Sequence, residues 1–168
     1  MKIKNLFVAL FATAALLFAG CGKDVKLNGT TWQARVTQDM TEMILEEMSD
    51  DPDGLAMWEQ LIDMMGGKFE VNMDFILAFT DETNGKATLK MSVANTDKLP
   101  AEIGKMIDQM MSQSQTENFT YTFDGEKGTI TIDDDTENFT YNKSDKTITM
   151  SVDAEDYGVE TFVFSEVK

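Results

Sequence analysis

The chain has 168 residues, with 14 Lys and Arg against 30 Asp and Glu, which gives a formal net charge of −16 at pH 7. Nucleic acid and anionic lipid headgroups should repel such an acidic chain, which excludes binding driven by attraction to phosphates. The chain contains no histidine, which excludes His-based catalytic triads and the usual zinc sites.

The first 20 residues have the composition of a secretory signal peptide. Two lysines near the N-terminus precede an apolar run over residues 6–18, which ends in the small residues Ala19 and Gly20. This run is too short to cross a membrane as a helix. We therefore expect residues 1–20 to direct export and residues 21–29 to form a lipidated N-terminus and a short tether.

The only cysteine of the chain, Cys21, follows this leader directly. The run LFAGC at 17–21 resembles the lipobox of bacterial lipoproteins, in which the cysteine receives a diacylglycerol and becomes the mature N-terminus. The resemblance implies a stable membrane anchor, since several acyl chains hold far better than one. Gly22 stands where the inner-membrane retention signal would place Asp, so we expect the outer membrane, with the periplasmic or surface-exposed face undecided.

Next come patterns typical of a strand and of two short helices. Apolar and polar side chains alternate over residues 30–37, which predicts a first strand. Asp39 is the expected N-cap of a helix, with Glu42 in capping-box position. Asp53 can cap a second helix that ends at Gly66. The sequence thus predicts a helical hairpin after the first strand.

The clearest strand pattern covers residues 68–80, where every second side chain is apolar. An Asn-Gly pair at 84–85 predicts a turn into a third strand over residues 86–94. Pro100 suits the first turn of a third, short helix, although Gly104 weakens that pattern. We therefore expect a strand hairpin followed by a helix.

The last third of the chain contains an internal repeat. Residues 116–121 and 136–141 both read TENFTY, and each copy precedes a turn and a TIT triplet, at 129–131 and 147–149. The two connections differ by two residues, which keeps every side chain on its own face because the strand period is two. We predict four antiparallel strands here, and a closing strand over residues 159–167.

Together these patterns predict a mainly β domain over residues 30–168, an antiparallel up-and-down barrel of about eight strands with the helical hairpin and the third helix. LNGTTW at 27–32, YTFDGEKGTITI at 121–132 and ETFVFSEV at 160–167 resemble the small lipocalin-like lipoproteins of Gram-negative bacteria. The resemblance implies a calycin-type barrel whose interior can bind an apolar molecule. The helices after the first strand also resemble, in topology only, the lid of intracellular fatty-acid carriers.

We expect a non-enzymatic, membrane-anchored lipoprotein that binds a small apolar or amphipathic ligand. The expected ligand-binding residues lie on the helices and on inward strand faces: Trp32, Met43, Trp58, Ile62, Met65 and Phe75. The alternative is a structural or protein-interaction module of the cell envelope with a filled barrel. A cavity would favour the ligand, whereas large side chains that meet across the axis would favour the module.

Three other kinds of site receive less support. Residues 49–60 resemble a calcium loop in part, but Ser49 and Gln60 replace the Asp and Glu expected at its ends. Clustered methionines could hold Cu(I), although their helical spacing is more typical of core packing. Carboxylate pairs at 133–135 or 155–156 could hydrolyse glycosides but are typical of solvated turns. We expect no metal, no cofactor and no catalytic residue.

Overall fold

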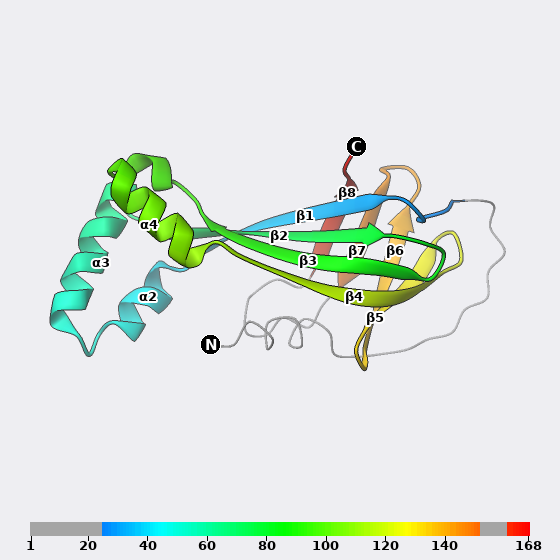
Figure 1. The fold of residues 1–168 in the computed structure, drawn as a ribbon, viewed down its shortest axis with the longest axis horizontal. Coiled ribbons are helices and arrows are strands. Elements are labelled where there is room, and N and C mark those ends of the chain that lie inside the picture. The colour runs from blue at the N-terminus through cyan, green and yellow to red at the C-terminus, as the bar shows by residue number, and fades with distance from the viewer. Residues whose placement is uncertain (1–24, 152–160) are drawn as a thin grey trace. The chain divides into compact units, whose positions relative to one another are not determined.

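A computed structural model describes residues 25–151 and 161–168 (Figure 1). Its eight strands form a closed antiparallel barrel in which each strand pairs with its neighbours in the chain, and β8 closes onto β1. This confirms the predicted fold class, including the helical hairpin after the first strand and the third helix. The predicted signal peptide, Cys21 and the carboxylate pair at 155–156 lie outside the described residues.

The elements agree closely with the predicted ranges. The strands are β1 (Thr31–Asp39), β2 (Glu70–Phe79), β3 (Asn84–Val93), β4 (Gln113–Phe123), β5 (Lys127–Ile132), β6 (Asp135–Asn142), β7 (Thr147–Ser151) and β8 (Thr161–Glu166). The helices are α2 (Thr41–Glu47), α3 (Pro52–Met65) and α4 (Ala101–Met111), with a short 3-10 turn η1 (Thr96–Lys98) before α4.

The chain divides into two compact units. The first unit contains the residues up to Ala34, Phe75–Thr88 and Thr116–Lys168, and so holds β5 to β8 with one part of each of β1 to β4. The second unit contains Arg35–Asp74 and Leu89–Gln115, with all three helices and the other parts of β1 to β4. Within this second unit the helices lie together beyond the strand ends (Figure 1).

Both predicted helix caps in the second unit are wrong. Asp39 is the last residue of β1, and its carboxylate accepts hydrogen bonds from the backbone N–H of Thr41 at 3.1 Å and from the Thr41 hydroxyl at 2.5 Å. Met40 therefore holds the N-cap position of α2, without a side-chain hydrogen bond. For α3, Asp51 rather than Asp53 is the N-cap, and it accepts from the N–H of Gly54 at 3.2 Å.

The core of the second unit forms where α3 meets the start of β2. Ile62 and Met65 are buried on one face of α3, and Phe69, immediately before β2, has no exposed surface. Trp58 contacts the Phe69 ring edge to face, with the ring centres 5.4 Å apart. The helix ends at Gly66, whose left-handed φ of 101° suits glycine.

The predicted turn at Asn84–Gly85 is also wrong, because both residues belong to β3. An aspartate builds the turn instead. Asp81 accepts hydrogen bonds from the N–H groups two and three residues further on, at 2.9 and 2.8 Å. Asp124 does the same between β4 and β5, at 2.9 and 2.7 Å. These bonds supply acceptors for backbone N–H groups of the turns that have no hydrogen-bond partner on a neighbouring strand.

The TENFTY repeat has the register that the loop lengths predict. Tyr121 pairs with Ile130 of the first TIT triplet, and Tyr141 pairs with Ile148 of the second. The two extra residues in the first connection therefore lengthen the loop without changing which residues face each other.

The repeat continues into the strand before each TENFTY segment. A Cβ atom added to Gly85 would lie 2.2 Å from the Phe119 ring, and one added to Gly128 would lie 2.3 Å from the Phe139 ring. Phe119 and Phe139 hold the same position in the repeat, so each covers a glycine on the preceding strand. Such a glycine leaves room for the aromatic ring, which covers the exposed backbone in return.

The threonines that begin the two TENFTY segments are equivalent as well. The hydroxyls of Thr88 and Thr116 lie 3.0 Å apart across β3 and β4, and those of Thr131 and Thr136 lie 2.8 Å apart across β5 and β6. The strand pairs β3–β4 and β5–β6 are therefore two copies of one design, of which only the TENFTY part is evident as a repeat in the sequence.

Replacing Gly128 by Ala should destabilise the protein by about 3 kcal/mol, at the upper end of the range for overpacking. The new methyl group would meet the Thr122 carbonyl oxygen at 2.3 Å as well as the Phe139 ring, and a backbone oxygen cannot rotate away. Urea unfolding followed by circular dichroism measures the loss. Gly67→Ala is the control, because it strains a φ of 86° but meets no atom within 4 Å, and about 1 kcal/mol is expected. Equal losses would contradict the steric explanation.

Candidate functional site

Aromatic rings occupy the interior of the first unit. Phe79 of β2 is 1% exposed, and its ring centre lies 5.4 Å from that of Phe119, 4.7 Å from Tyr121 and 6.1 Å from Phe139. Phe119 and Tyr121 belong to β4 and Phe139 to β6. Strands β2 and β6 are four apart in a closed barrel of eight, so the Phe79 and Phe139 rings meet across the axis.

Further ring contacts join other strands of the same unit. Trp32 of β1 meets Tyr141 of β6 edge to face, with ring centres 5.8 Å apart. Phe75 of β2 lies 4.6 Å from Phe162 of β8. Trp32 is also fixed at its polar edge, since its Nε1–H donates to the Thr30 hydroxyl at 2.7 Å. Side chains from opposite walls therefore pack against one another in this part of the barrel.

The residues predicted to bind a ligand are divided between the two units. Trp32 and Phe75 belong to the first unit, where both contact other aromatic rings. Met43, Trp58, Ile62 and Met65 belong to the second. There, Ile62 and Met65 are core residues, whereas Met43 is 42% exposed on α2. The set is therefore divided between two units, and the proposed ligand role of these residues stays a prediction.

One buried carboxylate was not predicted. Glu137 of β6 is 3% exposed, and its Oε1 has no hydrogen-bond partner among the described residues. It pairs with Ile130 of β5 and shares a strand face with Phe139. The signal was present in the sequence, because strand alternation places the glutamate of TENFTY on the same face as its aromatic residues.

Burial raises the pKa of Glu137 to about 7, since an apolar surrounding disfavours the charged carboxylate. A hydrogen bond from the backbone of Asn138 lowers this pKa, and the nearby charge of Asp135 raises it. Burial is the largest of the three causes. Near neutral pH the side chain therefore exchanges between a neutral and a charged form, although it sits in a protein interior.

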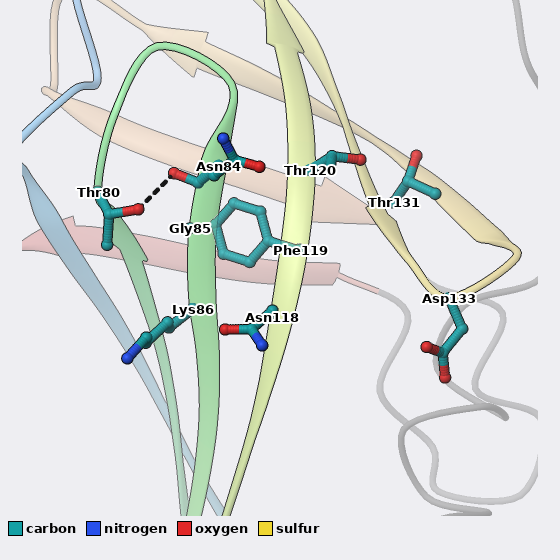
Figure 2. Close-up of a pocket in the computed structure, with 9 residues that line it drawn as sticks. All are labelled: Thr80, Asn84, Gly85, Lys86, Asn118, Phe119, Thr120, Thr131 and Asp133. Carbon is teal, nitrogen blue, oxygen red and sulfur yellow. Dashed lines mark hydrogen bonds between the residues drawn. The ribbon is translucent and has the colours of Figure 1, made fainter.

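A pocket of about 300 Å³ lies on the outer side of β3, β4 and β5, in the first unit (Figure 2). Most of its lining is polar and exposed. The lining residues are Thr80, Asn84, Gly85, Lys86, Asn118, Phe119, Thr120, Thr131 and Asp133.

The polar residues of the pocket form two rows across the three strands. Thr120 pairs with Thr131, and the β3–β4 register given by the Thr83–Tyr121 hydrogen bond places Asn84 beside Thr120. By the same β3–β4 register, Lys86 and Asn118 form a second row, and Asp133, the first residue after β5, lies in the turn beyond that row. In Figure 2 these last three lie on one side of the Phe119 ring and the first row lies on the other. The pocket is not evident in the sequence, because its residues are far apart along the chain.

No group of three or more His, Cys, Asp or Glu side chains placed to hold a metal ion occurs within residues 25–151 and 161–168. None of the helices in these ranges combines the length and the apolar composition that a membrane crossing needs. Comparisons of the chain with protein-family models, with curated proteins and with solved structures give no match.

Proposed function

We propose that the protein is a membrane-anchored β-barrel lipoprotein of the cell envelope that acts by contact with another envelope protein. The observation that carries this proposal is the aromatic packing of the first unit. Rings from opposite strands meet there, as Phe79 and Phe139 do at 6.1 Å, and leave a filled core at that level. Of the two hypotheses drawn from the sequence, a packed interior favours the interaction module over the carrier of a small apolar molecule.

The proposed contact surface consists of exposed methionines on the helices of the second unit. Their side chains are 37% to 57% exposed, so apolar atoms of each one remain in contact with water. They are Met43, Met57, Met64, Met106 and Met110. Met106 and Met110 are four residues apart on α4 and so share one helix face. Flexible thioether side chains fit an irregular partner surface well.

The charge around these methionines indicates the kind of partner. Acidic side chains outnumber basic ones on α2, α3 and α4. A partner with an apolar centre and a basic rim would therefore be steered toward the helices. The lipid anchor expected at Cys21 would hold the protein at the outer membrane, where a membrane-bound partner can be reached without free diffusion.

Photo-crosslinking in cells tests the proposed contact. We expect a photoreactive amino acid at Met106 or at Met110 to give the same discrete protein adduct, because both positions lie on one face of α4. The control position is Val163 of β8, which is 54% exposed but belongs to the first unit, and no adduct is expected there.

Two outcomes would contradict the proposal. The first is the absence of an adduct at both helix positions. The second is a stable one-to-one complex of the unmodified full chain with palmitic acid in native mass spectrometry, which would support the small-ligand hypothesis instead.

A further inference from the structure

Some of the side chains that line the pocket on β3, β4 and β5 form no hydrogen bond or ion pair with the rest of the described chain. Thr80 donates to the Asn84 carbonyl oxygen at 2.9 Å, and the Thr131 hydroxyl pairs with Thr136 at 2.8 Å. The Asn84 amide is held by Asp81 at 3.0 Å. These groups are fixed. The remaining polar side chains make no hydrogen bond or ion pair within the part of the chain that the structure describes: Lys86, Asn118, Thr120 and Asp133.

Together these four side chains offer both hydrogen-bond donors and hydrogen-bond acceptors. The Lys86 ammonium only donates and the Asp133 carboxylate only accepts, whereas the Asn118 amide and the Thr120 hydroxyl do both. A simple anion would meet the Asp133 carboxylate, and a simple cation would meet the Lys86 ammonium. A hydroxyl group donates and accepts at once, so several adjacent hydroxyls can satisfy all four side chains.

We propose that this pocket binds a neutral, polyhydroxylated molecule, namely one sugar ring. Lys86 and Asn118 lie side by side on the neighbouring strands β3 and β4, about 4.8 Å apart, so vicinal hydroxyls can bridge these two side chains. The volume of about 300 Å³ is at the lower limit of ligand pockets, which suits a single ring. The fixed Thr80, Asn84 and Thr131 form a wall that needs no rearrangement.

Saturation-transfer NMR on the full chain tests the sugar site. The protein is purified in a polyoxyethylene detergent, which carries no sugar headgroup, and is mixed in turn with glucose, galactose, mannose and N-acetylglucosamine. We expect the ring protons of at least one sugar to receive saturation from the protein. Asn118→Ala should weaken that binding about fivefold, as expected for the loss of one hydrogen bond.

The repeat provides a matched control. Asn138 holds the position of Asn118 in the second TENFTY segment, is also exposed, and does not line the pocket. Asn138→Ala should leave the binding unchanged, and Thr120→Val serves as a second pocket variant if Asn118→Ala fails to fold. The proposal is overturned if no sugar receives saturation, or if Asn138→Ala weakens binding as much as Asn118→Ala does.

Discussion

Replacing Phe79 by Ala is expected to lower the free energy of unfolding by about 4 kcal/mol, within the range for large aromatic residues in a core. The ring is almost completely buried and contacts three other rings, on β4 and β6. Its removal leaves a cavity at the level where opposite walls of the barrel meet. Urea unfolding at constant pH, with the slope checked for constancy, measures the loss.

Phe75→Ala is the matched comparison on the same strand. Phe75 is only partly buried, and within the described residues its ring contacts one other ring, that of Phe162, at a tilt of 60°. The smaller area that it removes from water should limit the loss to about 2 kcal/mol. If Phe79→Ala and Phe75→Ala destabilise the protein equally, then the contact across the axis is not what holds this part of the barrel together.

The stability of the protein should fall as the pH rises from about 5 to about 7, because of Glu137. Its pKa is about 7 in the folded chain, above the ordinary value of 4.5 that it regains on unfolding. Between these values the unfolded chain has released the proton while the folded chain still holds it, so rising pH favours unfolding. The full effect is at most about 3 kcal/mol and is complete above the folded pKa.

Glu137→Gln isolates this contribution, because glutamine has the same shape but does not titrate. We expect the variant to gain stability over the wild type as the pH rises through this window. Asp81 and Asp124 do not interfere, since turn N–H groups lower their pKa values, and their effect appears only as the pH falls below about 4. If the free energies of unfolding of the wild type and of Glu137→Gln change equally with pH between pH 5 and 8, the burial of a titrating carboxyl group at this position is contradicted.

The strands could be predicted from the sequence because their faces follow a local rule. Phe69, Val71, Met73, Leu77 and Phe79 alternate with mostly polar residues, and all five are buried in the structure. Local rules also led to the two wrong helix caps: Asp39 suits an N-cap but remains part of β1, and Asp51 and Asp53 both suit the N-cap of α3. The choice between them depends on where a strand ends and on which N–H groups remain free, and neither is a local property.

The outer pocket and the glycine pairs could not be predicted, for a different reason. An Asn-Gly pair commonly forms a turn, so the sequence predicts a turn at Gly85, whereas the role of Gly85 depends on Phe119, which lies far along the chain. Lys86, Asn118 and Asp133 likewise line one pocket only once β3, β4 and β5 are aligned. Glu137 is the exception, since its alternation with Phe139 was available in the sequence.

The duplicated strand pair has a consequence for the order of assembly. The Thr131–Thr136 pair closes a short loop, whereas the Thr88–Thr116 pair closes the whole segment 89–115, which belongs to the second unit. Each doubling of a closed loop costs about 0.6 kcal/mol in chain entropy. The β5–β6 copy can therefore form from local contacts alone. The β3–β4 copy has to bring distant segments together first. The β5–β6 pair should therefore form faster than the β3–β4 pair, although the two share one design.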